Sequence, residues 1–442
     1  MKKILVIGAG RSAVTLIKYL LDNAEVNNWS VTVADFSEEL AKQAVNNHPN
    51  AKAIFFNVTD VVQRENEITA TDIVISMLPP AMHIMVAEDC VRLGKNLVTA
   101  SYVSKEILAL DEKAKKAGVL LLNEIGLDPG IDHMSAMQVI DQIKENGGEL
   151  TSFKSFCGGL VHPDYDNNPW NYKFTWNPRN VVLAGQGTAQ YIKQGKYKYI
   201  PYHKLFGRTE QMSVLEAGEF EGYANRDSLG YRKAYGLEDI LTLFRGTLRR
   251  KGFCKSWNMF VQLGMTDDTY VVENSENMTY REFTNLFFPF NNELTVEQKF
   301  CNYLSVSKNS EEFQKAEWAG IFLDSEIGMT NATPAQILQA ILEKKWTLGA
   351  EDKDMIVMQH QFEYMQNGKQ QKLNSSLLVF GDDPRYTAMA KTVGLPVAIA
   401  VKLILSGAIN SVGVKIPTTK DIYVPVLKEL KENGINFIEE LV

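Results

Sequence analysis

The chain has few cysteines, and this scarcity narrows the chemistry it can carry. Its 442 residues include only Cys90, Cys157, Cys254 and Cys301, and none of them forms a C-x-x-C pair. Neither a zinc site nor a dithiol redox site is therefore indicated, and we predict no metal. Sparse, widely spaced cysteines suit a reducing compartment, so we expect a cytoplasmic protein.

Hydrophobic segments long enough to cross a membrane are also lacking. The apolar stretch from 395 to 405 contains Lys402 and is too short to span a bilayer. The apolar start of the chain ends at Arg11, and no small-residue cleavage site follows it. We therefore predict neither a signal peptide nor a membrane partner.

An excess of positive charge is missing as well. Lys and Arg number 46 against 53 Asp and Glu, which gives a formal net charge of −7. A chain this acidic binds polyanions poorly, so we expect no nucleic-acid partner. The length exceeds the roughly 250–300 residues at which one hydrophobic core stops growing, and two or three domains are expected.

The N-terminus carries the turn of a dinucleotide-binding domain. A short apolar strand at 4–7 leads into G-x-G-x-x-A, and a helical pattern follows at 14–21. In this motif Gly8 permits the tight turn, Gly10 lets the backbone approach a pyrophosphate, and Ala13 allows close helix packing. The helix start then offers unpaired N–H groups to phosphate. The alternative is a glycine turn in another α/β domain without a nucleotide.

A second strand at 30–34 ends at Asp35. An acidic residue there can bind both ribose hydroxyls of NAD and would repel the extra phosphate of NADP. We therefore predict NAD as the cofactor, with NADP disfavoured. Further strands are expected at 52–56, 72–76, 96–99 and 119–122, with helices at 37–46 and 105–117. This alternation predicts an α/β fold with a doubly wound parallel sheet.

The rest of the chain changes character. A loop at 123–133 leaves the first domain, and a helix is expected at 131–145. A strand at 151–156 should end at Cys157-Gly158-Gly159. From 237 to 346 helical signals dominate, with Leu241, Phe244 and Leu248 at helical spacing. Asn367-Gly368 between alternating runs predicts a hairpin. The apolar helix expected at 388–405 should pack back on the first domain.

Several separate runs resemble saccharopine dehydrogenases over nearly the whole length of the chain. The resemblance implies a Rossmann-type dinucleotide domain, an α+β catalytic domain with a mixed sheet, and a helical insertion. We place these at 1–130 with part of 385–442, at 131–236 with 350–384, and at 237–349. The runs are TASY at 99–102, EIGLDPGIDH at 124–133, CGGL at 157–160, YKFTW at 172–176, NRDS at 225–228, RGTLR at 245–249 and AMAKTVGLP at 388–396.

The resemblance also implies an activity, the oxidative cleavage of saccharopine to L-glutamate and 2-aminoadipate 6-semialdehyde in lysine metabolism. Fungal biosynthetic members carry a basic residue near the second strand end and use NADP. This chain has Asp35-Phe36-Ser37 instead, which favours the degradative, NAD-linked branch. Thr175 stands where the family usually has serine, so the hydroxyl is retained.

The sequence motifs and the resemblance together give three sets of predicted site residues. Asp128 and Tyr102 are the predicted catalytic residues. The predicted substrate site comprises Ser101, Tyr102, Asp128, Cys157, Lys173, Arg226, Arg245, Gly246 and Thr247. The predicted cofactor site comprises Gly8, Gly10, Arg11, Ser12, Ala13, Asp35, Phe36, Asn57, Val58, Met77, Leu78, Ser101, Leu127 and Thr175.

Residue chemistry supports these roles while leaving alternatives open. An arginine guanidinium can bind a carboxylate through two parallel N–H···O hydrogen bonds. Arg226 and Arg245 are therefore suitable ligands for the carboxylates of a tricarboxylate substrate. On the residues alone, surface ion pairing is the favoured interpretation of each arginine. Asp128 is the predicted proton carrier, acting through water or Tyr102, although an Asp-Pro-Gly aspartate commonly bonds its own turn. Cys157 could line the site, and a buried structural thiol is an equally good interpretation of it. His133 could shuttle protons, but a residue at the start of a helix is its favoured interpretation.

Two rival functions remain. A carboxynorspermidine dehydrogenase of polyamine synthesis would share the scaffold, and a non-catalytic nucleotide-sensing module would share the fold. The complete NRDS and RGT runs favour the tricarboxylate substrate over the polyamine precursor. A homodimer is one open option for assembly.

Overall fold

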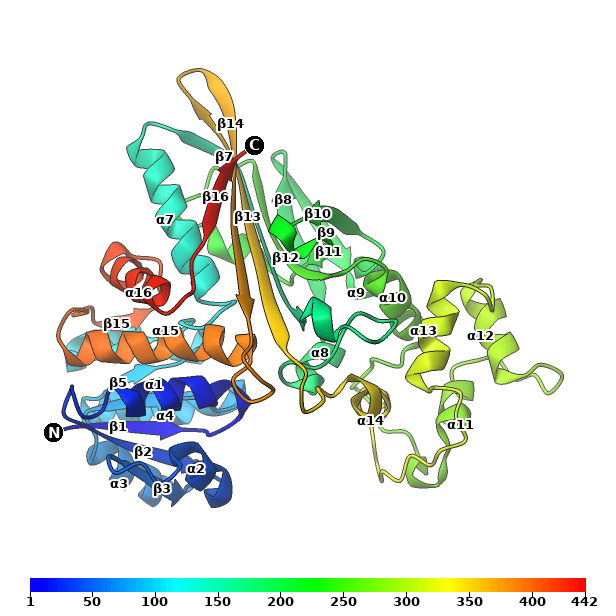
Figure 1. Cartoon of the computed structure of the whole chain (residues 1–442), viewed down its shortest axis with the longest axis horizontal. Helices are drawn as coiled ribbons and strands as arrows, with labels where there is room; N and C mark the ends of the chain where they lie inside the picture. The colour runs from blue at the N-terminus through cyan, green and yellow to red at the C-terminus, as the bar shows by residue number, and fades with distance from the viewer. The chain divides into compact units, whose positions relative to one another are not determined.

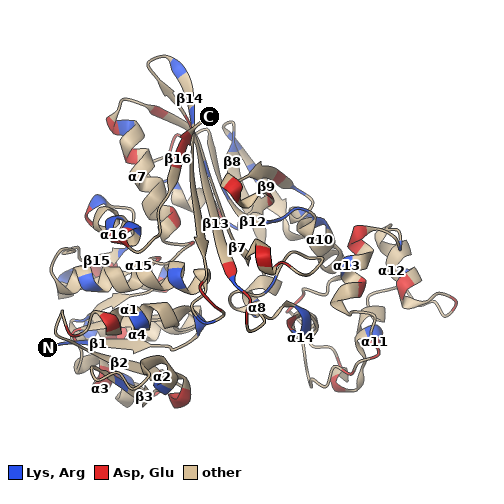
Figure 2. Cartoon of the chain, viewed as in Figure 1, with Lys and Arg blue, Asp and Glu red and all other residues tan.

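The computed structural model describes all residues from 1 to 442 and divides them into two compact units (Figure 1). Unit 1 comprises Met1–Leu150 together with Tyr364–Val442, and unit 2 comprises Thr151–Glu363. The three-part division predicted from the sequence stays a prediction. Lys, Arg, Asp and Glu are interspersed along the elements of both units (Figure 2).

Unit 1 is built on a seven-stranded sheet in the order β15-β6-β5-β4-β1-β2-β3. Every neighbouring pair in it is parallel, which confirms the predicted doubly wound sheet. The central strands are apolar over most of their length because helices cover both faces of such a sheet. The strands are β1 Lys2–Ile7, β2 Trp29–Asp35, β3 Ala51–Phe55, β4 Ile73–Ser76, β5 Asn96–Val98, β6 Leu120–Leu122 and β15 Gly413–Lys415.

Some helices of unit 1 begin at polar side chains that cap their free N–H groups. Ser37 accepts from Leu40 N at the start of α2, and Asp60 accepts from Gln63 N at the start of α3. The helix predicted at 105–117 is two helices that are separated at Ala109 and Leu110. The helical elements are η1 Arg11–Ala13, α1 Val14–Asp22, α2 Glu38–Val45, α3 Val61–Thr69, η2 Pro80–Met82, α4 His83–Leu93, α5 Lys105–Leu108, α6 Asp111–Ala117, α7 Ile131–Glu145, α15 Ala388–Leu405 and α16 Lys420–Glu432.

Two groups of helices enclose the sheet of unit 1. One apolar cluster joins the sheet to the inner faces of α3, α4, α5 and α6, with Ile68, Val86 and Ile107 among its buried members. Helix α15 packs along α1 and against β4 and β5 (Figure 1). By length and composition α15 could cross a membrane, but 61% of it is buried inside the protein, and core helices meet the same criterion.

The contact between α15 and α1 is made at a glycine. A Cβ atom at Gly394 would lie 2.8 Å from Leu16 N and 3.3 Å from Ser12 O. These backbone atoms belong to the turn and helix that follow β1, so no flexible side chain can give way. The bare backbone of Gly394 therefore fixes how closely α15 approaches the glycine-rich turn.

Unit 2 contains most of a second, mixed sheet in the order β10-β11-β12-β7-β13-β14-β16, with β8 paired to β12 and β9 to β8. Strands β7 and β12 are parallel, whereas β10, β11 and β12 are antiparallel. The predicted hairpin around Asn367-Gly368 is confirmed as β13 and β14. The strands are β7 Glu149–Val161, β8 Thr188–Lys193, β9 Lys196–Pro201, β10 Thr209–Ser213, β11 Glu219–Ala224, β12 Thr242–Arg250, β13 Asp354–Gln366, β14 Lys369–Phe380 and β16 Ile438–Leu441.

Two sequence predictions for unit 2 are wrong, and both concern this sheet. The run with Leu241, Phe244 and Leu248 at helical spacing is not helical, because most of it forms the buried strand β12. The strand predicted to end at Cys157 continues through Gly158 to Val161. A Cβ atom at Gly158 would lie 2.7 Å from Leu248 O, so this glycine permits close strand approach and does not end the strand.

The remaining elements of unit 2 are mostly helical from residue 253 to 346, as predicted. They are η3 Pro163–Tyr165, α8 Pro178–Val182, α9 Tyr202–Leu205, η4 Leu215–Ala217, η5 Leu229–Tyr231, α10 Phe253–Leu263, η6 Ser275–Asn277, α11 Tyr280–Asn285, α12 Val296–Leu304, α13 Glu311–Ala319 and α14 Pro334–Trp346.

The contact at Gly394 gives a test of the packing of α15. Replacing glycine by alanine inside a helix normally stabilises it by about 1 kcal/mol. At Gly394 we expect the opposite sign, a loss of about 1–3 kcal/mol, because the added methyl group meets the backbone of α1. Denaturant unfolding of Gly394→Ala measures the change, and a more stable variant would contradict this account of the contact.

Candidate functional site

The glycine-rich turn of unit 1 combines one crowded glycine with one open glycine. Gly8 has φ +106°, and a Cβ atom there would lie 2.8 Å from Met77 O. A Cβ atom at Gly10 would meet nothing within 4 Å, and Gly10 and Arg11 are both exposed. No side chain caps the start of η1 at Gly10. The turn therefore offers an open backbone strip to an anionic group beside an exposed guanidinium.

Asp35 supports this turn from the end of β2. Its Oδ2 accepts from Ala9 N at 2.7 Å and its Oδ1 accepts from Ser37 N at 2.8 Å. Both carboxylate oxygens are thus engaged with backbone donors. Beside it, the rings of Phe36 and Phe55 contact each other with centroids 5.5 Å apart, and both are well exposed. An exposed aromatic pair can stack on a flat ring such as a nucleotide base.

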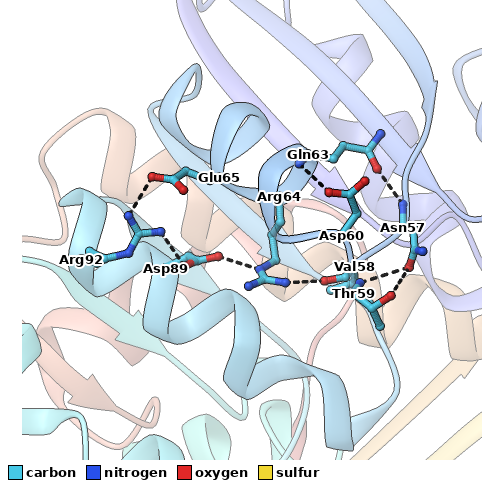
Figure 3. A network of polar contacts seen from close by, with 9 residues as sticks. All are labelled: Asn57, Val58, Thr59, Asp60, Gln63, Arg64, Glu65, Asp89 and Arg92. Carbon is cyan, nitrogen blue, oxygen red and sulfur yellow. Dashed lines mark hydrogen bonds and ion pairs between the residues drawn. The ribbon is translucent and has the colours of Figure 1, made fainter.

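A polar network fixes the turn between β3 and α3 (Figure 3). The side chain of Asn57 accepts from Thr59 N, and Asn57 N donates to Gln63 Oε1. Arg64 is buried and donates from Nη1 to Val58 O at 2.6 Å and from Nε to Asp89 Oδ2 at 2.6 Å. Of the predicted cofactor residues, Val58 is therefore held by Arg64 and Asn57 by Gln63, and no pattern in the sequence indicates either supporting residue.

Asp89 also binds a second arginine, in a different environment. Arg92 donates from Nη2 to Asp89 Oδ1 at 2.8 Å and from Nη1 to Glu65 Oε1 at 2.9 Å. The side chain of Arg92 is 49% exposed, whereas that of Arg64 is 8% exposed. The same carboxylate thus joins one buried and one exposed guanidinium.

The predicted catalytic pair lies where β5 and β6 end. Tyr102 Oη donates to Asp128 Oδ1 at 3.3 Å. Ser101 and Tyr102 follow β5, and Glu124 N donates to Ser101 O at 3.0 Å, which ties the two loops together. Tyr102 is 48% exposed and Asp128 is partly buried. The structure therefore brings Ser101, Tyr102 and Asp128 together at one edge of the unit 1 sheet.

A buried carboxylate–histidine contact braces these loops. Glu124 accepts from Val103 N through Oε1 at 3.0 Å, and its Oε2 lies 2.9 Å from His133 Nε2. Asp132 accepts from Gly130 N at 2.6 Å, at the turn that begins α7. All three side chains are buried. His133 lies in the first turn of α7, as predicted, and its bond to Glu124 gives it a structural partner that the sequence did not indicate.

In unit 2 the NRDS loop and the RGT strand bind each other. Arg245 lies on β12, where its N donates to Ser228 Oγ at 2.9 Å and its O accepts from Asn225 N at 2.8 Å. The Arg245 guanidinium lies over the Tyr231 ring, 4.3 Å from the centroid, and the side chain is buried. Arg226 is exposed and takes part in no ion pair. The two predicted carboxylate clamps thus differ in exposure.

Other predicted residues of unit 2 lie on neighbouring strands or in buried contacts. Thr247 is directly paired with Cys157 across β12 and β7, and Gly246 leaves room for the Phe156 ring, which a Cβ atom would approach to 2.7 Å. Lys173 is buried and donates to Asp352 at 2.6 Å. Thr175 is buried, and its hydroxyl makes no hydrogen bond.

The structure thus groups the predicted residues within each unit, and the assignment of these residues to substrate and cofactor stays a prediction. The unit 1 group contains the glycine-rich turn, Asp35, the 57–58 turn, Met77 and Leu78 after β4, and the loops with Ser101, Leu127 and Asp128. The unit 2 group lies on β7, β12 and the loops that they bind.

Comparison with known proteins assigns the family. The family model described as the saccharopine dehydrogenase NADP binding domain matches residues 4–122, and the model described as the saccharopine dehydrogenase C-terminal domain matches residues 126–435. The chain belongs to the saccharopine dehydrogenase family. The resemblance inferred from the sequence runs is therefore confirmed.

Curated relatives of this family align along the whole chain. Saccharopine dehydrogenase [NADP(+), L-glutamate-forming] of Schizosaccharomyces pombe is 33% identical and is covered to 99%, and that of Saccharomyces cerevisiae is 34% identical and is also covered to 99%. Mitochondrial alpha-aminoadipic semialdehyde synthase of Mus musculus is 33% identical. The chain spans about half of that relative, 47% of its length.

Two solved structures share the fold of this chain. Apo saccharopine dehydrogenase (L-Glu forming) from Saccharomyces cerevisiae matches with a TM-score of 0.90 at 32% identity, and each chain is fully covered. Homospermidine synthase from Legionella pneumophila matches with a TM-score of 0.58 at 10% identity over all of this chain and 91% of that one. The second likeness shows the fold alone.

The comparisons contradict the cofactor prediction. The names of the fungal relatives carry NADP(+), and the model matching the N-terminal domain is an NADP binding domain, so the preference for NAD over NADP is wrong. That prediction treated Asp35 as a bare acceptor facing the ribose. In the structure Asp35 accepts hydrogen bonds from two backbone N–H groups. Its support of the glycine-rich turn therefore explains why an acidic residue stands at the end of β2.

The residues of unit 1 fit a phosphorylated dinucleotide. The open side of Gly10 and the exposed Arg11 can receive anionic oxygens, and the exposed Phe36–Phe55 pair can stack on a base. The described residues hold no group of three or more His, Cys, Asp or Glu side chains that could bind a metal ion.

The two arginines on Asp89 provide a matched pair of variants. Arg64→Ala leaves the buried Asp89 carboxylate without its buried partner and should lower stability by about 3–5 kcal/mol. Arg92→Ala removes an exposed contact to the same carboxylate and should change stability little. Denaturant unfolding measures both, and equal losses would contradict the buried role of Arg64. Weaker cofactor binding is expected only for Arg64→Ala, because only Arg64 holds Val58.

Proposed function

We propose that the chain is an NADP-dependent saccharopine dehydrogenase that cleaves saccharopine oxidatively to L-glutamate and 2-aminoadipate 6-semialdehyde. The observation that carries the proposal is the contact between Tyr102 and Asp128, which lies on loops after β5 and β6 in the same sheet as the glycine-rich turn. In an open α/β sheet, ligands bind outside the carboxyl ends of the strands. Full-length similarity to named enzymes of this activity supports it.

The substrate sets the tasks for the residues. Saccharopine is a tricarboxylate with a central secondary amine, and NADP supplies the hydride acceptor when it is bound. A hydride leaves the carbon beside nitrogen, the resulting imine adds water, and the carbinolamine collapses to the amine and the aldehyde. The protein must bind the carboxylates, align the reacting carbon and move protons.

Arginine and aspartate perform these tasks in the proposal. Arg226 is exposed and unpaired, so its guanidinium is available to a carboxylate of the substrate. Arg245 is held by Tyr231 and by the backbone bonds of β12, which makes it a rigid positive group. Asp128 accepts the proton released from nitrogen, with Tyr102 hydrogen-bonded to its Oδ1 as the group that orients it.

The rival functions give different outcomes in one assay. We expect the purified chain to reduce NADP+ when saccharopine is added, with glutamate as a product, and parallel reactions with NAD+ compare the two cofactors. Turnover of a carboxynorspermidine-type substrate without turnover of saccharopine would replace the proposal. Nucleotide binding without turnover of either substrate would favour a sensing module. A cytoplasmic location, a role in lysine degradation and a homodimer stay predictions.

The proton role of Asp128 is tested by a matched pair of Tyr–Asp contacts. Asp128→Asn should lower kcat by about a hundredfold to ten-thousandfold, because positioned acid–base groups contribute that much. The control is Asp141→Asn, since Tyr423 Oη donates to Asp141 Oδ2 at 2.6 Å in another tyrosine–aspartate pair of unit 1. Steady-state rates across pH measure both variants. A wild-type rate and pH profile in Asp128→Asn would remove Asp128 from the mechanism.

A further inference from the structure

A buried histidine links two serines behind the predicted catalytic loop. His83 is the first residue of α4, and it is 1% exposed. Its Nδ1 lies 2.8 Å from Oγ of Ser76, the last residue of β4. Its Nε2 lies 2.7 Å from Oγ of Ser101, which follows β5. The three side chains therefore form one chain of hydrogen bonds within unit 1, and it ends at a residue of the predicted substrate site.

The imidazole in this chain is neutral. Burial lowers the pKa of His83 to about 4, because desolvation disfavours the charged ring. No carboxylate contacts the ring, and its two hydrogen-bond partners are hydroxyl groups. A neutral imidazole carries one N–H donor and one bare nitrogen acceptor. The two serines must therefore play opposite roles, one donating to the ring and the other accepting from it.

Ser76 decides the direction of the chain. Its side chain is fully buried, and His83 Nδ1 is the only hydrogen-bond partner of its hydroxyl. An unused O–H donor in such a place is unfavourable, because its lost hydration is not replaced by another hydrogen bond. Ser76 therefore donates to Nδ1, and the ring proton lies on Nε2. The Nε2–H group then donates to Ser101 Oγ.

The direction of the chain determines what Ser101 can offer to a ligand. Because its oxygen accepts the proton of Nε2, the O–H of Ser101 remains for another acceptor. Ser101 is only partly buried, and no other hydrogen bond uses its hydroxyl. Its backbone is held by Thr99 Oγ1 and Glu124 N, so the residue has little freedom to turn away.

We propose that His83, together with Ser76, is a positioning residue that presents the hydroxyl of Ser101 as a fixed hydrogen-bond donor to an anionic oxygen of the substrate. This inference rests on the proposed function for the identity of the ligand. It does not depend on that function for the direction of the hydrogen-bond chain. His83 itself touches neither substrate nor cofactor and acts only through Ser101.

Substitutions at His83 separate positioning from packing. Asn at position 83 keeps a polar group near the Nδ1 position but loses the contact with Ser101. Gln keeps an N–H donor near the Nε2 position. We expect His83→Asn and Ser101→Ala each to lower kcat/KM for saccharopine about tenfold or more, mainly through KM. Ser101→Ala removes the hydrogen bond to the charged substrate, and His83→Asn removes the group that directs that hydroxyl. His83→Gln should recover most of the loss.

The decisive measurement is the double variant. If His83 acts only through Ser101, adding His83→Asn to Ser101→Ala lowers kcat/KM no further. Cys90→Ala is the stability control, because Cys90 is a fully buried residue of the same helix and is not a member of this hydrogen-bond chain. It should lower the unfolding temperature without changing KM. Additive losses in the double variant, or wild-type kinetics in Ser101→Ala, would overturn the proposal.

A readout without substrate tests the direction of the chain. Ring ¹⁵N NMR of protein labelled at its six histidines, with His83→Asn identifying the signal, reports which nitrogen carries the proton. We expect a neutral ring protonated at Nε2 throughout about pH 6 to 8, and a mixture of tautomers in Ser76→Ala. A proton on Nδ1 in the wild type would overturn the inference. A wild type that fails to oxidise saccharopine would instead refute the proposed function and leave this result standing.

Discussion

The close approach of β1 and β4 is the constraint on which the unit 1 site depends. The two strands are neighbours in the sheet although α1, α2 and α3 separate them in sequence. Gly8 lies against Met77 O where both strands end, so position 8 has no room for a side chain. The strand β1 leads into the glycine-rich turn, and β4 leads into Ser76, Met77 and then α4 with His83. One backbone contact therefore positions both the glycine-rich turn and the residues that reach Ser101.

Buried polar groups then convert this sheet edge into a rigid site. Asp35 holds the glycine-rich turn, Arg64 holds the turn at Val58, and Glu124 joins the loop after β5 to the helix α7 through His133. Each of these side chains satisfies backbone or side-chain groups of a loop that has no regular hydrogen bonding of its own. Such contacts reduce the freedom of the loops before any ligand arrives, which is the condition for effective positioning.

Local patterns predicted unit 1 well and unit 2 less well, for a physical reason. The unit 1 strands are short apolar runs followed by turns, and their parallel order follows from the alternation with helices. In unit 2 the run Leu241 to Leu248 has helical spacing, yet β12 lies between β7 and β11 and buries polar as well as apolar side chains, so the alternation of a half-exposed strand is lost. The bracing residues Arg64, Glu124 and His83 bind partners 6 to 25 residues away in the chain, and no spacing rule reveals such pairs.

The cofactor prediction depended on the position of one residue, whereas the inference about Ser101 depends on three hydrogen-bonded residues. Asp35 at a strand end has two explanations, a ribose contact or a turn support, and its position alone does not separate them. Ser76, His83 and Ser101 constrain one another, because a neutral ring has one donor and a fully buried hydroxyl needs an acceptor. Only one arrangement of hydrogen bonds satisfies both conditions. The fully buried hydroxyl of Ser76 therefore determines the direction in which the hydroxyl of Ser101 can donate.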